Sequence, residues 1–270
     1  MSETRATGRR VVVKIGTSSL IHDSGRVNLQ TIDRLAYALS AMNNAGTEVI
    51  LVTSGAIGVG LAAQHLQTRP AAIAEQQALA AIGQSSLMRL YGERFTDYGA
   101  SIAQLLLTHD VFDFPESRRH VLDTIAALLA KKVIPIINEN DSVATDELDH
   151  KTTFGDNDQL SALVATSIDA DMLIVLSDIA GLYAQNPKQH PEAMLIPVVA
   201  GPAALGQAQA SGAGSRFGTG GMVTKLNAAR TMMAAGKQMV LCSGADPRIV
   251  LKVLEGAPVG TWFGTKEGQS

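Results

Sequence analysis

Short apolar runs alternate with longer amphipathic segments along the whole chain. The apolar runs are rich in β-branched residues and end at small polar turns, which is typical of buried strands. They predict strands at residues 11–15, 48–53, 101–107, 133–137, 172–176, 238–242 and 260–263. Between them, apolar positions three and four residues apart predict helices at residues 28–46, 71–95, 114–131, 156–168 and 222–235.

This alternation favours an α/β fold, a three-layer αβα sandwich with a mostly parallel central sheet. No repeat, linker or low-complexity tail interrupts the pattern, so we expect residues 1–270 to form a single domain. The segment 200–221 is rich in Gly, Ala and Ser and is expected to be a mobile surface connection. The last strand, 260–263, is expected at an edge of the sheet.

Composition narrows the class of protein. Of the 270 residues, 46% are hydrophobic and 17% are charged, and the net charge is −3. This balance gives no basic face for nucleic acid, and no apolar run approaches the roughly 18 residues of a membrane span. The single cysteine, Cys242, stands in an apolar run and is expected to be an inert core thiol. With no signal-like N-terminus, the sequence favours a cytoplasmic protein.

Polar side chains occur where four of the predicted strands end. Lys14, Ser54, Asp141 and Ser177 each close or follow an apolar run. The carboxyl ends of parallel strands share one edge of the sheet, and ligands of α/β proteins bind there. We therefore expect these four side chains to surround the functional site.

The most acidic stretch, residues 138–158, lies between a predicted strand and a predicted helix. Acids packed between buried elements cost solvation free energy unless a cation offsets them. That cation is a metal, a lysine or the ammonium group of a substrate. The six histidines show no metal-binding spacing, and the P-loop pattern G-x-x-x-x-G-K-[ST] is absent.

Two lysines stand beside glycine-rich turns in distant parts of the chain. Lys14 precedes Gly16, and Lys225 follows the glycine-rich run 218–221 at the start of a predicted helix. Taken alone, Lys14 is equally compatible with a solvated lysine at a strand end. Helix N-terminal N–H groups and an ammonium group together favour an anion. Two converging lysines suit a polyphosphate, because phosphoryl transfer requires charge stabilisation above all.

Six motifs stand in an order that resembles the amino acid kinase family, in detail its glutamate 5-kinase branch. They are VVKIGTS at 12–18, VTSGAI at 52–57, NENDSV at 138–143, FGDND at 154–158, SDIAGLY at 177–183 and GTGGMVTK at 218–225. The resemblance covers about residues 10–264. It implies ATP-dependent phosphorylation of the side-chain carboxylate of L-glutamate, the first step of proline biosynthesis.

The resemblance also implies roles for residues in these motifs. Lys14 would contact the transferring phosphate, Lys225 would lie on the phosphates of the nucleotide from the other side, and Asp158 would hold both ammonium groups in position. Residues expected to bind glutamate are Ser54, Gly55, Asp141 and Asn157. Residues expected to bind ATP are Lys14, Ser177, Asp178, Thr219, Gly220, Gly221, Met222, Val223, Thr224 and Lys225. Mg²⁺ would be held mainly by the nucleotide, with few or no protein metal ligands. Residues 10–168 would then bind glutamate, and residues 169–264 would bind ATP.

The chemistry of the implied substrate agrees with the absence of a predicted general base. A glutamate side chain, with a pKa near about 4.3, is already ionised at neutral pH. Asp141 suits the α-ammonium of free glutamate, whereas N-acetylglutamate has no such charge to pair with a desolvated aspartate. Two alternatives are a related kinase such as acetylglutamate kinase and a non-catalytic sensor of the same fold. The presence of Lys14, Lys225 and Asp158 argues against the sensor.

Further expectations come from the resemblance. Proline is expected to inhibit by competing in the glutamate pocket, a glutamyl phosphate reductase is expected to consume the product, and a homo-oligomer, dimer or tetramer, is expected. The apolar region 71–95 is the expected subunit contact. Two departures from the family pattern are expected: no C-terminal PUA domain, and a longer connection at 146–153 that we interpret as an ordinary surface loop.

Overall fold

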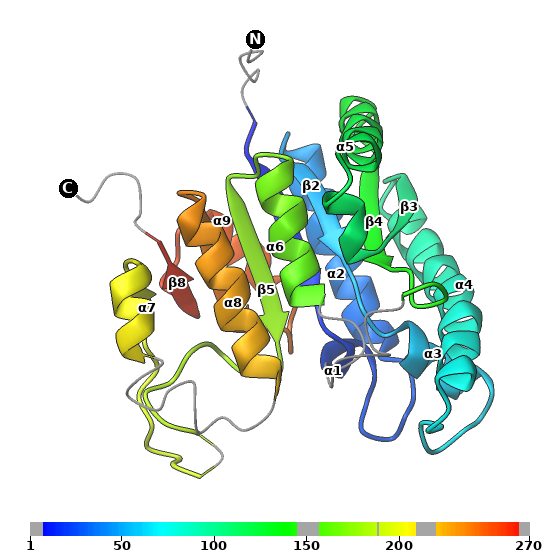
Figure 1. The fold of residues 1–270 in the computed structure, drawn as a ribbon, viewed down its shortest axis with the longest axis horizontal. Helices are drawn as coiled ribbons and strands as arrows, with labels where there is room; N and C mark the ends of the chain where they lie inside the picture. The colour runs from blue at the N-terminus through cyan, green and yellow to red at the C-terminus, as the bar shows by residue number, and fades with distance from the viewer. Residues whose placement is uncertain (1–7, 145–156, 188, 209–219, 265–270) are drawn as a thin grey trace.

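The computed structural model describes residues 8–144, 157–187, 189–208 and 220–264 (Figure 1). In this part of the chain the strands form one eight-stranded sheet with the order β3-β4-β2-β1-β5-β7-β8-β6. Neighbouring strands pair in parallel, apart from the antiparallel pair β7 and β8. The strands are β1 (Arg10–Ile15), β2 (Glu48–Val52), β3 (Ile102–Leu107), β4 (Ile134–Glu139), β5 (Met172–Ser177), β6 (Val198–Val199), β7 (Gln238–Ser243) and β8 (Thr261–Phe263).

Helices cover both faces of this sheet. One face packs against α5, α6, α7 and α8, and the other against α1, α2, α3, α4 and α9 (Figure 1). The helices are α1 (Thr17–Leu20), α2 (Leu29–Asn44), α3 (Ala56–Ala63), α4 (Ile73–Asp97), α5 (Pro115–Ala130), α6 (Asn157–Ser167), α7 (Pro202–Ala208), α8 (Gly220–Ala234) and α9 (Ile249–Leu254), with a 3₁₀ turn η1 (His109–Phe112). None of these described helices is both long and apolar enough to cross a membrane.

Covering both faces explains why the central strands are apolar without alternation. In β1, the side chains of Val11 and Val13 enter one core, and that of Val12 enters the other. The predicted three-layer α/β fold with a mostly parallel sheet is therefore confirmed. The predicted strands and helices are also present, with ends within two residues of those expected. Cys242 is fully buried, and burial raises the pKa of its thiol to about 12.

Two predictions about the C-terminal part were wrong. Part of the expected mobile connection at 200–221 is the helix α7, whose Leu205 is buried in the core. Because Leu205 stands among small residues, the sequence pattern did not predict a helix here. The strand at 261–263 is not at the edge of the sheet, because the short strand β6 pairs along its outer side. The remaining residues of that connection, 209–219, and the 146–153 loop lie outside the described residues.

Helices α3 and α4 pack with their backbones in contact. A Cβ atom at Gly83 would collide with the carbonyl oxygen of Ala56, and one at Gly60 would collide with that of Leu79. Gly55, immediately before α3, has φ of 93°, in the left-handed region that favours glycine. Gly60 and Gly83 thus bring α3 directly against α4, and Gly55 allows the chain to turn from β2, past Ser54, into α3.

Candidate active site

The carboxyl ends of β4, β2, β1 and β5 lie side by side at one edge of the sheet. Lys14 of β1 is in register with Val52 of β2 and with Val175 of β5, so these ends are level with one another. In the sheet, β2 lies on one side of β1, and β5 followed by β7 lies on the other side, so the order of the strands diverges at β1. Such a point of divergence is where α/β proteins place their ligands. The expectation that the polar strand ends share one edge is confirmed.

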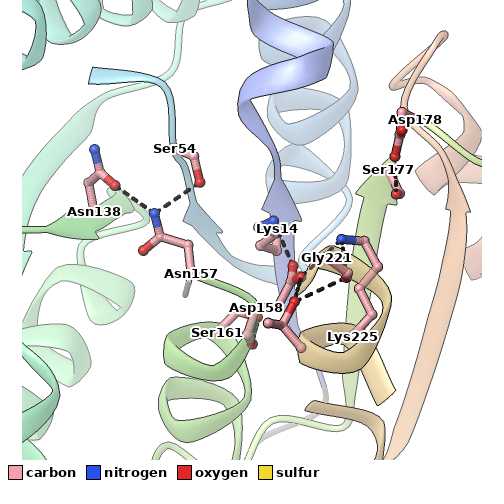
Figure 2. Close-up of polar contacts among 11 residues, drawn as sticks. Lys14, Ser54, Asn138, Asn157, Asp158, Ser161, Ser177, Asp178, Gly221 and Lys225 are labelled. Atoms are coloured by element: carbon pink, nitrogen blue, oxygen red, sulfur yellow. Dashed lines mark hydrogen bonds and ion pairs between the residues drawn. The ribbon is translucent and has the colours of Figure 1, made fainter. Parts of the chain in front are cut away.

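Asp158 lies between two lysines at this point, as Figure 2 shows. Its Oδ1 is 2.6 Å from the Nζ of Lys14, and its Oδ2 is 3.0 Å from the Nζ of Lys225. The hydroxyl of Thr224 donates a hydrogen bond of 2.8 Å to the same Oδ2. Lys225 also donates to the carbonyl oxygen of Gly221, in the first turn of α8. Three elements, β1, α6 and α8, thus meet at one carboxylate.

The two lysines keep the Asp158 carboxylate charged in spite of its burial. Asp158 and Lys14 are only 4% and 6% exposed. Burial raises the pKa of the Asp158 carboxyl, but the ammonium groups of Lys14 and Lys225 outweigh that effect and lower the pKa to about 2. Asp158 is therefore ionised at neutral pH. Two ammonium groups against one carboxylate leave a net positive charge, which favours an anion.

A second cluster, made of amide and hydroxyl groups, adjoins the first through the preceding residue. The Nδ2 of Asn157 donates to the Oγ of Ser54 at 2.9 Å and to the Oδ1 of Asn138 at 3.1 Å (Figure 2). Ser54, Gly55, Asn157 and Asp141 line one cavity of about 210 Å³. The four residues predicted to bind one substrate are thus brought together.

Asp141 in this cavity titrates close to neutral pH. Burial raises the pKa of its carboxyl to about 6, and the charge of Arg69, which lines the same cavity, opposes part of the rise. The group is therefore largely ionised at pH 7 and becomes protonated in mild acid.

The residues predicted to bind ATP are spread around the lysine cluster. The hydroxyl of Ser177, at the end of β5, donates to the Oδ1 of Asp178 at 3.0 Å. Gly220 and Gly221 begin α8. The side chain of Met222 is buried in the core, so its backbone is what it can offer a ligand, whereas Val223 is half exposed. Thr219 lies outside the described residues.

Several residues at the site were not predicted as site residues, among them Asn138, Arg69 and Gln84. Asn138 lies in one of the quoted motifs, and its place at the end of a strand could have identified it. Arg69 and Gln84 follow no local pattern, because the fold alone brings them to the end of β4. Within the described ranges, no group of three or more His, Cys, Asp and Glu side chains is placed to hold a metal ion.

Comparison with known proteins places the chain in a family. The model of the amino acid kinase family matches residues 9–243. The chain belongs to the amino acid kinase family. Within it, the chain is 56% identical to glutamate 5-kinase from Lactiplantibacillus plantarum, over 95% of this chain and 97% of that protein. It is 55% identical to glutamate 5-kinase from Ligilactobacillus salivarius, over 96% and 97% of the two chains.

Solved structures of other proteins share the amino acid kinase fold of this chain. Carbamate kinase from Giardia lamblia bound to AMP-PNP superposes with a TM-score of 0.67 at 16% identity, over 96% of this chain and 99% of that one. UMP kinase from Bacillus anthracis superposes with a TM-score of 0.63 at 16% identity, over 94% and 95%. At such identities the likeness concerns the fold of the family.

Proposed function

We propose that this chain transfers the γ-phosphoryl group of ATP to the side-chain carboxylate of L-glutamate, forming L-glutamyl 5-phosphate. The observation that carries the proposal is the cluster of Lys14, Asp158 and Lys225, in which Lys14 and Asp158 are buried, beside the cavity of Asn157 and Ser54. The first cluster is cationic and suits phosphates, and the second suits an amino acid. The high identity to glutamate 5-kinases over nearly the whole chain supports the same substrate.

The lysines supply the electrostatic part of the proposed reaction. An oxygen of the glutamate side-chain carboxylate attacks the γ-phosphorus of ATP, a new P–O bond forms, and the bond to the β–γ bridging oxygen breaks to release ADP. Lys14 and Lys225 offset the repulsion between the two anions and stabilise the charge on the transferred group. Asp158 holds the two ammonium groups at opposite ends of its carboxylate. The attacking group is already ionised, so no proton has to be removed.

Substrate binding is divided between the two clusters in this proposal. Glutamate occupies the cavity of Ser54, the Gly55 turn, Asp141 and Asn157, with its α-ammonium near Asp141. ATP, carrying Mg²⁺ on its phosphates, lies over the ends of β5 and α8. The nucleotide-binding residues are Lys14, Ser177, Asp178, Thr219, Gly220, Gly221, Met222, Val223, Thr224 and Lys225. Residues 10–168 thus form a glutamate-binding part and residues 169–264 an ATP-binding part of a single domain.

The direct test is ATP turnover by the purified protein with different acceptors. We expect ADP release with L-glutamate and little release with N-acetylglutamate, because the acetylated amine cannot pair with Asp141. Aspartate, carbamate and UMP serve as further acceptors, since related kinases are named for other substrates. Faster turnover with N-acetylglutamate than with glutamate would assign the chain to a different substrate. No turnover with any acceptor would favour a sensor.

The efficiency of the enzyme toward glutamate should fall in mild acid. The pKa of Asp141 is raised to about 6, and only the ionised form attracts the substrate ammonium. Below pH 6, kcat/KM for glutamate should therefore fall about tenfold per pH unit. The Asp141→Ala variant should show a high KM for glutamate, a nearly unchanged kcat and no inflection near pH 6. A variant that retained the wild-type pH profile would show that another group titrates.

We propose that proline inhibits by competing in the glutamate cavity. Proline has the α-carboxylate and the α-ammonium of glutamate in a cyclised form, so it fits the same charged groups. Millimolar proline should raise the apparent KM for glutamate and leave kcat unchanged. Rates measured at low and at saturating glutamate test this. Unchanged activity at low glutamate would exclude the proposed competition.

The setting of the reaction is also part of the proposal. The product is a labile acyl phosphate, so a glutamyl phosphate reductase should consume it as the next step of proline biosynthesis in the cytoplasm. We propose a homo-oligomer, dimer or tetramer, with α4 at the subunit contact, because Ile73 and Ile82 expose apolar surface there. A monomer in sizing chromatography with light scattering would contradict this assembly.

A further inference from the structure

A row of four carboxamide side chains links the outer helix α4 to the proposed glutamate cavity. The Nε2 of Gln84 in α4 donates to the Oε1 of Gln104 in β3 at 3.0 Å. The Nδ2 of Asn138 in β4 donates to the Oε1 of Gln84 at 2.8 Å. Asn157 in turn donates to Asn138. Gln84, Asn138 and Asn157 are each less than 9% exposed.

The direction of these hydrogen bonds is fixed by a backbone group. The backbone N–H of Glu139 donates to the Oδ1 of Asn138 at 2.9 Å, and a backbone nitrogen has no acceptor alternative. The opposite end of the Asn138 carboxamide is therefore its NH₂ group, which requires an acceptor, and Gln84 supplies one. The Oδ1 of Asn138 must likewise receive the NH₂ group of Asn157, so the orientation of Asn157 is also determined.

This orientation determines what Ser54 does in the cavity. Asn157 donates to the Oγ of Ser54, so the hydroxyl proton of Ser54 is directed to another acceptor. Ser54 lines the cavity, where the carboxylates of an amino acid are suitable acceptors. The side-chain Oδ1 of Asn157 is buried and has no hydrogen-bond partner among the described residues.

We propose that Gln84 is a positioning residue for the amino acid substrate, acting through Asn138 and Asn157 to present the Ser54 hydroxyl as a donor to a substrate carboxylate. Two side chains, those of Asn138 and Asn157, lie between Gln84 and Ser54 in this row. The close packing of Gly83 on Ala56 brings it within reach of Asn138. This role depends on the proposed phosphorylation of glutamate, since it concerns how that substrate binds.

The test is a double-mutant cycle between Gln84 and Ser54, with steady-state kinetics on the full chain. Gln84→Leu leaves the buried NH₂ group of Asn138 without an acceptor and should raise the KM for glutamate about tenfold, with kcat changed less than about twofold. Ser54→Ala should also raise this KM. If Gln84 acts through Ser54, Gln84→Leu should add little in the Ser54→Ala background. Independent, multiplying effects would overturn the proposal.

Three further variants keep the outcome decisive if Gln84→Leu folds poorly. Gln84→Glu retains an acceptor for Asn138 and should keep a near wild-type KM. Gln104→Leu changes an exposed side chain and should raise the KM about threefold, because Gln84 loses its own acceptor. Ser85→Ala, on the same turn of α4 but outside the row, is the matched control and should have no effect. A raised KM in Gln84→Glu, or an unchanged KM in Gln104→Leu, would contradict the proposed row.

These measurements separate this role from the proposed function. If the wild-type protein does not phosphorylate glutamate, the function fails before any variant is compared. If the wild-type protein does so and the Gln84 and Ser54 variants act independently, the function stands and the positioning role of Gln84 is refuted.

Discussion

Replacing Lys225 with alanine should lower kcat about 10²- to 10³-fold and leave the KM for glutamate within about twofold. Lys225 contacts Asp158 and the first turn of α8, and it does not line the cavity of Ser54 and Asn157. Its ammonium group should therefore act on the transferring phosphate and contribute little to glutamate binding. Initial rates with both substrates varied will separate the two parameters.

A matched control for this variant is available at the surface. Lys237 also forms an ion pair with an aspartate, Asp169, but the Asp169 side chain is 75% exposed. Lys237→Ala should leave both kinetic constants unchanged, because exposed ion pairs contribute little. If Lys225→Ala raised the KM for glutamate at constant kcat, Lys225 would belong to the glutamate site and the division of roles would be wrong.

Replacing Asp158 with asparagine should cost both activity and stability. The variant retains the shape of the side chain but leaves the buried ammonium group of Lys14 and the partly buried one of Lys225 without a counter-charge. Breaking a buried ion pair in this way typically lowers the free energy of unfolding by about 3–5 kcal/mol. We expect kcat to fall about 10³-fold, since neither lysine is then held in place. Urea unfolding and initial rates measure the two effects.

The double variant Asp158→Asn with Lys225→Met distinguishes charge from packing. Removing one of the two uncompensated ammonium groups should restore part of the lost stability without restoring activity. If the double variant were less stable than Asp158→Asn alone, the stability of the site would depend on side-chain contacts more than on charge balance.

Much of the fold follows from local patterns in the sequence. Runs such as 11–15 predict central strands because helices bury both faces, and the Asn28 side chain caps α2 by accepting the N–H of Thr31, as its residue type suggests. Two features of the fold were not predicted, because one depends on a single buried side chain and the other on which strand pairs with which. One buried leucine, Leu205, fixes α7, and the outermost place of β6 depends on its partner β8.

The site was predictable to a similar extent and for similar reasons. Lys14, Asp158 and Lys225 stand in motifs whose order resembles one family, and the structure brings the three together. Their roles in catalysis stay predictions. The contact between Gln84 and Asn138 joins residues 54 positions apart, and it exists because a helix approaches the sheet closely. No local spacing encodes such a contact.

The glycine contacts between α3 and α4 have a mechanical consequence. At Gly60 and Gly83 the backbones of the two helices are in direct contact. No side chains lie between the helices at these points to accommodate a relative displacement. We therefore expect α3 and α4 to move together. A displacement of the 25-residue helix α4, about 37 Å in length, would then also shift the turn before α3 that carries Ser54.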